Sequence, residues 1–162
     1  MQTFAVLRSL TLVTLANGAP VIAKRIFGSR FSWPLDAGLK FFDRQPLLGP
    51  SKTVRGALVS ILTTTASAPL VGLQPKIGAL VAGTAMLGDL LSSFVKRRLK
   101  LQSSSRAFGL DQVPESLLPL LACRYVLALS VADIVAAVGL FLVGEIILSR
   151  LLYKVHLRDE PY

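Results

Sequence analysis

The sequence predicts an all-α integral membrane protein with about five transmembrane helices. Hydrophobic residues make up 52% of its 162 residues and charged residues only 17%, with a mean hydropathy of +0.61. Soluble domains carry about 25% charged residues. Apolar stretches near the roughly 20 residues that a membrane helix needs recur along the chain. Positive charge gathers between them, which is typical of cytoplasmic loops. A single domain is expected over residues 1–162.

The expected spans follow one another with short connections on one side of the membrane. They are Phe4–Ala23, Gly56–Leu73, Ile77–Val95, Leu117–Val131 and Ile134–Val155. Only residues 74–76 separate the second span from the third, so these two form a tight hairpin, with Pro75 suited to the first turn of the next helix. The fourth span is short, and it needs little tilt or some help from flanking residues.

The first span contains residues that weaken a regular helix, namely Asn17, Gly18 and Pro20. Two interpretations remain open: a frayed helix, or irregular backbone that lines a cavity within the protein. A cleaved signal peptide is disfavoured, because a basic leading segment is missing and Arg8 interrupts the apolar stretch.

The placement of positive charge predicts the orientation. Five spans put residues 24–55, 96–114 and 150–162 on one side, and these segments hold fifteen of the chain's 18 Lys and Arg residues. Such segments remain in the cytoplasm. We therefore expect the N-terminus outside and the C-terminus in the cytoplasm, within the cell membrane. The net charge of +9 then indicates anionic lipid or nucleotide partners rather than nucleic acid.

Two residue types are too scarce for some chemistries. Cys123 is the single cysteine and His156 the single histidine. A disulfide framework, a cysteine zinc site and a serine–histidine mechanism are therefore excluded.

A polar stripe ends the third expected span. Asp89, Ser92, Ser93 and Lys96 follow at i, i+3, i+4 and i+7, which is one face of a helix. A carboxylate inside a membrane is costly and indicates a functional site. Beside Lys and Arg it suggests Mg²⁺ and phosphate together. Arg98 falls on the opposite face, about 180° from Asp89, and should matter less.

Two loops could complete this site. Ser51, Lys52, Thr53 and Arg55 precede a helix, whose N-terminus would favour phosphate; ordinary loop charge with Ser51 as a cap is the alternative. The order of residues does not fit a P-loop. Asp111 can cap the next helix, or it can meet Asp89 to hold a metal.

Five motifs resemble those of the CDP-archaeol synthase family, which is related to the phosphatidate cytidylyltransferases. They are Asn17-Gly18-Ala19-Pro20, Asp36-Ala37-Gly38, Leu48–Gly56, Gly88–Arg97 and Leu110–Pro114. Together they cover nearly the whole chain in order. The resemblance implies a five-span enzyme with catalytic loops in the cytoplasm. It also implies condensation of CTP with a lipid phosphate, which gives a CDP-lipid and pyrophosphate, with Mg²⁺ as cofactor.

The resemblance also implies residue roles. Asp89 and Asp111 would bind the metal and act in catalysis with Lys96. Phosphate would be held by Lys52, Thr53, Arg55, Ser93, Lys96 and Arg97, with their basic groups in one cavity. The oligomeric state is left open. A small transporter and a catalytically inactive scaffold for anionic lipid are the alternatives.

One more expectation concerns the last two spans. If the chain reverses near Asp133, then Arg124 and Glu145 fall at about the same depth. Because a lone charge there costs about 2.5–3.5 kcal/mol, we expect these two residues to form an ion pair. The alternative is that Arg124 turns toward the site and takes a substrate phosphate.

Overall fold

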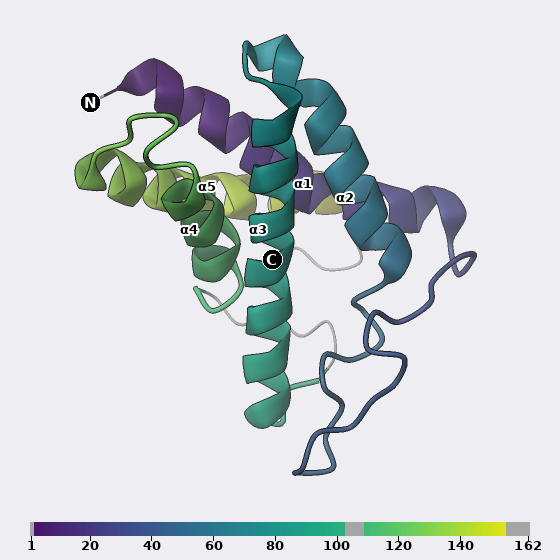
Figure 1. Ribbon diagram of the computed structural model, residues 1–162. Coiled ribbons are helices and arrows are strands. Elements are labelled where there is room, and N and C mark those ends of the chain that lie inside the picture. The colour runs from purple at the N-terminus through teal and green to yellow at the C-terminus, as the bar shows by residue number, and fades with distance from the viewer. Residues whose placement is uncertain (1, 103–108, 155–162) are drawn as a thin grey trace.

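The computed structural model describes residues 2–102 and 109–154, with side chains as far as Leu151, and it is helical (Figure 1). The helices are α1 (Thr3–Phe27), α2 (Val54–Ser67), a 3₁₀ turn η1 (Ala68–Val71), α3 (Pro75–Arg98), α4 (Gln112–Ala122) and α5 (Val131–Lys154). Within the described ranges, bridges of β type occur only singly, in the loop of residues 28–53 and at its junction with α2. The expected all-α class is confirmed.

Local signals set the helix starts. The Thr53 hydroxyl accepts a hydrogen bond from the Gly56 N–H at 3.1 Å and so caps α2. Pro75 opens α3, where its missing N–H costs nothing. Ser130 and Asp133 cap each other's backbone N–H groups at 3.0 and 3.1 Å, which fixes the start of α5.

Four helical segments are long and apolar enough to cross a membrane. They are Thr3–Phe27, Val54–Val71, Pro75–Arg98 and Val131–Leu151. They match the first, second, third and fifth expected spans, although Val155 lies outside the described residues. The first span is one continuous helix through Pro20, so neither fraying nor irregular backbone occurs there.

The fourth expected span has different bounds. α4 begins at Gln112 rather than Leu117 and ends at Ala122 rather than Val131. Its 11 residues cover about 16 Å, too little to cross a hydrocarbon core of about 30 Å. Apolar content alone misplaced this helix, because residues 125–128 are apolar and yet form turns, with Ala128 at a φ of 50°.

The chain runs back and forth between two ends of the bundle. At one end, called the N-terminal end, the Gln2 N–H donates to the Asp133 carboxylate at 3.0 Å, and Arg8 lies beside Gly72. At the other, called the loop end, Arg55 donates to the Gly28 carbonyl at 3.0 Å. α4 and residues 123–130 together return the chain from the loop end to the N-terminal end.

α3 is the centre of the packing, in contact with α1, α2 and α4 (Figure 1). Two glycines permit this. A Cβ on Gly78 would lie 2.6 Å from the Thr64 carbonyl oxygen of α2, and one on Gly88 would lie 2.3 Å from the Pro114 carbonyl oxygen of α4. Small residues allow such close backbone approach between membrane helices. Gly88 therefore sets how α4 sits against the polar stripe of α3.

Candidate active site

The polar stripe of α3 lies at the loop end, between α4 and the loop of residues 28–53. α3 and α4 run antiparallel, because Asp111 at the start of α4 pairs with Lys96 near the end of α3, while Pro114 lies against Gly88. Residues from three separate segments thus meet in one place.

Each of the two carboxylates that were expected to bind a metal, Asp89 and Asp111, forms an ion pair with a lysine. The Lys96 ammonium lies 2.8 Å from one Asp111 carboxylate oxygen and 3.0 Å from the other. Lys52, from the loop, forms an ion pair with Asp89. The Lys96 side chain is 8% exposed, and the other three side chains are about 20% exposed. All four side chains are therefore largely buried, and that of Lys96 is the most buried.

Asp111 does not cap α4. It occupies the capping position, but its side chain makes no capping hydrogen bond and pairs with Lys96 instead. The capping interpretation of this residue is therefore wrong. The residues expected to hold a metal, Asp89 and Asp111, both lie in the cluster, on neighbouring helices and with different lysines.

Glu115 is a site residue that the sequence reasoning missed. Its side chain is hydrogen-bonded to Asp89, and Lys52 and Glu145 are the other charged groups near it. It is only 9% exposed. The available signal was spacing, because Asp111 and Glu115 lie four residues apart and so share one helix face. The carboxyl group in contact with Asp89 is thus Glu115, one turn along α4 from Asp111.

The remaining stripe residues of α3 are buried. Ser92 donates to the Gly88 carbonyl at 2.9 Å, and Ser93 is 2% exposed. Arg97 is 6% exposed and donates to the Gln102 carbonyl at 2.6 Å, while its Nε is buried without a partner in the described structure. Arg97 therefore has hydrogen-bonding capacity left for a ligand.

The loop presents Lys52 because Asp36 organises it. The buried Asp36 carboxylate accepts three backbone N–H groups, from Leu48, Gly49 and Gly38, at 2.9 to 3.0 Å. Burial raises the pKa of Asp36, but these donors outweigh burial and hold the pKa below its usual 3.8. A further bond, from the Leu35 N–H to the Lys52 carbonyl at 2.8 Å, ties Lys52 to the same turn.

Three other residues of interest serve the framework. Thr53 caps α2. Arg55 donates to the carbonyls of Gly28 and Arg30 beyond the end of α1, and is not brought to the lysine–carboxylate cluster. Arg98 forms an ion pair with Asp43 of the loop at 3.1 Å. This partner lies outside the lysine–carboxylate cluster, as expected for a residue on the helix face opposite Asp89.

The expected ion pair between Arg124 and Glu145 does not form. Arg124 takes part in none of the ion pairs of the described residues, and its guanidinium instead lies 5.8 Å from the centre of the Tyr125 ring. The reason is the early end of α4: Arg124 lies in the turns after this helix rather than midway along a span. Glu145 lies near Glu115, at the other end of α4.

The cluster therefore combines three carboxyl groups with two lysines and Arg97. Lysine and arginine bind phosphate oxygens. Carboxylates beside them bind hard divalent cations together with substrate phosphates. This chemistry suits a reaction between phosphorylated molecules at the end of a membrane helix bundle.

Known proteins are similar to this chain in sequence and in fold. A family model described as CarS-like CDP-archaeol synthase matches residues 75–162. A CDP-archaeol synthase of Pyrobaculum calidifontis is 34% identical over 157 residues, which is 91% of either chain. One from Hyperthermus butylicus is 40% identical over 126 residues, 72% of either chain.

A solved structure agrees with the sequence relatives. It is that of an intramembrane enzyme for the biosynthesis of archaeal membrane lipids, with a TM-score of 0.72 and 26% identity. The match covers 85% of this chain and 90% of that one. The chain therefore belongs to the CDP-archaeol synthase family and is a membrane enzyme that transfers a cytidylyl group from CTP to a lipid phosphate.

Proposed function

We propose that the lysine–carboxylate cluster at the loop end is where this transfer takes place. The lipid phosphate oxygen attacks the α-phosphorus of CTP. A new oxygen–phosphorus bond forms as the bond to the bridging oxygen breaks, and pyrophosphate leaves with that electron pair. Because the nucleophile is already an anion, no side chain has to remove a proton. That suits a chain with a single histidine, His156.

The single observation that carries the proposal is the meeting of Lys52, Asp89, Lys96 and Asp111 from three segments. In the reaction, Lys52 and Lys96 bind phosphate oxygens and offset the charge that gathers on the leaving pyrophosphate. Arg97 and Ser93 add donors from the same helix face. Catalysis then rests on positioning and on charge neutralisation. Thr53 and Arg55 act at one remove, by holding the start of α2.

The donor set fits Mg²⁺. Asp89, Asp111 and Glu115 offer carboxylate oxygens, which hard cations prefer. Two ammonium groups already occupy positions where positive charge is stabilised. Groups of three or more acidic, histidine or cysteine ligands at metal-binding separation do not occur among the described residues, so substrate phosphates would complete the coordination. When bound, the ion would stabilise negative charge on the phosphates.

The lipid and the side of the membrane complete the proposal. The relatives are CDP-archaeol synthases, so we take a lipid phosphate of the archaeol type as the substrate. Among the described residues, the basic segments 24–55 and 96–102 lie at the loop end. By the positive-inside rule this end faces the cytoplasm. The N-terminus then lies outside the cell and the C-terminus in the cytoplasm, with the protein in the cell membrane. One membrane-embedded domain would carry the activity.

A substrate panel tests the reaction. Purified protein in lipid nanodiscs is given CTP and Mg²⁺ with ether-linked or ester-linked lipid phosphates, and pyrophosphate release is measured. We expect release that depends on CTP and is fastest with the ether lipid. No release with any lipid phosphate would overturn the proposal and favour a transporter or a lipid-binding scaffold.

Matched variants test the site. Asp89→Asn and Asp111→Asn should each abolish turnover while the protein still folds, because each removes a charge that nothing else replaces. Asp43→Asn is the control, since Asp43 pairs with Arg98 outside the cluster, and it should keep most of the activity. Near-normal turnover in both of the first two variants would refute the assignment.

A further inference from the structure

Arg8 is a charged residue within an otherwise apolar membrane helix. It is the only charged residue between Thr3 and Ala23, and it lies on α1, a helix apolar and long enough to span a membrane. It lies five positions after Thr3, the first residue of α1, and so sits about 8 Å along the helix. A charge at such a depth needs a partner or a route to water.

The described protein supplies no ionic partner for Arg8. Its Nε is buried without a hydrogen-bond partner, and the ion pairs of the described residues involve other side chains. The guanidinium lies 4.5 Å from the centre of the Phe4 ring, a contact that uses its face and leaves its N–H groups free to bind a ligand. Gly72 lets it approach the turn before α3, since a Cβ there would lie 3.1 Å from an Arg8 terminal nitrogen.

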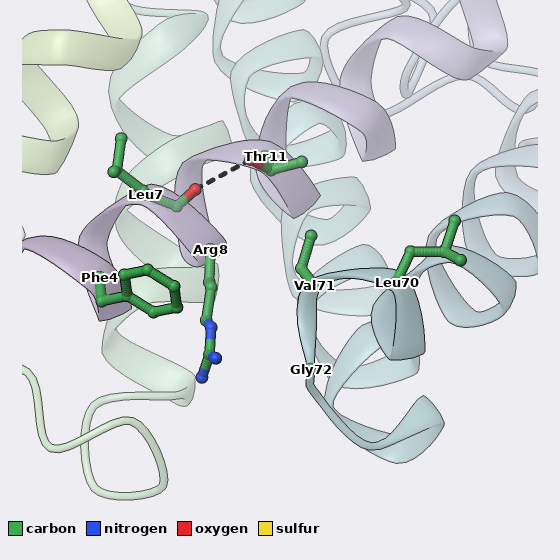
Figure 2. Close-up of a pocket in the computed structure, with 7 residues that line it drawn as sticks. All are labelled: Phe4, Leu7, Arg8, Thr11, Leu70, Val71 and Gly72. Atoms are coloured by element: carbon green, nitrogen blue, oxygen red, sulfur yellow. Dashed lines mark hydrogen bonds between the residues drawn. The ribbon is translucent and has the colours of Figure 1, made fainter.

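This guanidinium points into a cavity of about 380 Å³ between α1 and η1 (Figure 2). The other walls are mostly apolar and come from Phe4, Leu7, Leu70 and Val71. Phe4 and Leu70 are 70% and 84% exposed, so the cavity opens toward the surroundings of the helices. Thr11 lines the cavity too, but its hydroxyl already donates to the Leu7 carbonyl at 2.9 Å. One cation among apolar side chains matches a molecule with an anionic head and a hydrocarbon chain.

The cavity is remote from the candidate active site. Gly72 lies just before α3, whereas Lys96 lies 21 residues after its first residue, Pro75, which corresponds to about 31 Å of helix. A substrate phosphate reacting near Lys96 and Asp111 cannot also contact Arg8. The occupant is therefore a different molecule from the reacting lipid.

We propose that this cavity binds an anionic membrane phospholipid at the N-terminal end of the bundle. The Arg8 guanidinium takes the phosphate in a two-pronged contact, for which its planar fork is suited. A hydrocarbon chain lies along Phe4, Leu7 and Leu70. The bound lipid bridges α1 to the α2–α3 turn, and it does so independently of catalysis.

The test compares two charge-removing variants at the same end. Arg8→Gln removes the proposed ligand, and Lys76→Gln removes an exposed cation in the first turn of α3. Each protein is placed in nanodiscs of neutral phosphatidylcholine containing a small fraction of phosphatidylglycerol. Retained lipid is measured by native mass spectrometry, and the gain in thermal stability over pure phosphatidylcholine is measured in parallel.

We expect Arg8→Gln to lower phosphatidylglycerol retention about 10-fold or more, the usual effect of losing charge-assisted hydrogen bonds. Lys76→Gln should retain the wild-type amount. In pure phosphatidylcholine, Arg8→Gln should be at least as stable as the wild type, because an unsatisfied charge is gone. Arg8→Lys, which keeps the charge and loses the fork, should fall between.

Equal retention in the wild type and Arg8→Gln would overturn the proposal. So would an equal loss in Lys76→Gln, which would indicate general surface charge. A third contrary result is full stabilisation by inorganic phosphate alone, which would show that no lipid chain takes part.

Discussion

A single methyl group at Gly88 should separate the chemistry of the site from its fold. In Gly88→Ala the new Cβ would lie 2.3 Å from the Pro114 carbonyl oxygen and 2.8 Å from the Glu115 nitrogen. Ordinary contact begins near 3.4 Å, so α4 has to move by about 1 Å, and backbone atoms cannot step aside as side chains do. Asp111 and Glu115 move with α4. Misplacement by about 1 Å can cost about 100-fold in rate, and we expect a loss of that order in kcat/KM.

Two other glycines of the same helix are the controls. A Cβ on Gly83 has nothing within 4 Å, so Gly83→Ala should keep full activity and gain up to about 1 kcal/mol in stability. A Cβ on Gly78 would lie 2.6 Å from the Thr64 carbonyl oxygen, which strains the α2–α3 contact instead. Gly78→Ala should therefore lose stability without a comparable loss of activity per folded molecule.

The assay is pyrophosphate release per folded protein, with the folded fraction taken from a thermal unfolding curve. If Gly88→Ala loses no more activity per folded molecule than Gly78→Ala, the α3–α4 contact does not set the site. The geometric reasoning would then be refuted.

Further predictions concern four side chains. Lys96→Ala should lower kcat/KM at least several-fold, because it removes a charged phosphate ligand. Arg98→Ala should mainly lower thermal stability, because Arg98 binds Asp43 and the Pro46 carbonyl. Equal losses of kcat/KM in the two variants would contradict the assignment of the site to the helix face of Asp89 and Lys96. Asp36→Asn should destabilise the loop at neutral pH, with Trp33 fluorescence as the readout. The pKa of Asp36 is lower in the folded protein than in the unfolded chain. The stability that the ionised carboxylate contributes is therefore present above the unfolded pKa of about 3.9 and is lost as the pH falls through the folded pKa. The difference in stability between Asp36→Asn and the wild type should accordingly vanish in acid. Glu115→Gln should keep the fold and lower turnover, since it keeps a hydrogen bond to Asp89 but removes a carboxyl group; unchanged turnover would make Glu115 purely structural.

The polar stripe of α3 could be predicted from sequence because helical periodicity alone places Asp89, Ser93 and Lys96 on one face. In the structure Asp89 lies beside Lys52, and Lys96 lies beside Asp111. Four spans were also predictable, since apolar length is sufficient evidence for a membrane helix. Composition could not place α4, because its end depends on turns formed by residues that are themselves apolar.

The sequence could not predict which side chains from different segments form contacts with one another. From sequence, Asp111 could cap a helix or take another partner. It pairs with Lys96 because α4 packs closely against α3 at Gly88, which the sequence does not reveal. Glu115 was missed because the fourth span was expected to begin after it. Arg55 looked like a phosphate ligand by charge, but its reach to the Gly28 carbonyl depends on how α1 ends.

The cluster therefore depends on contacts that take no part in the chemistry. Lys52 reaches Asp89 because Asp36 gathers three backbone N–H groups and folds the loop back on itself. Arg98 fastens the same loop to α3, with its guanidinium 4.7 Å from the Phe41 ring and 4.9 Å from the Phe94 ring. On the other side, Gly88 admits α4. One helix, α3, thus supplies both the polar stripe and, through Arg98, the anchor for the loop that carries Lys52.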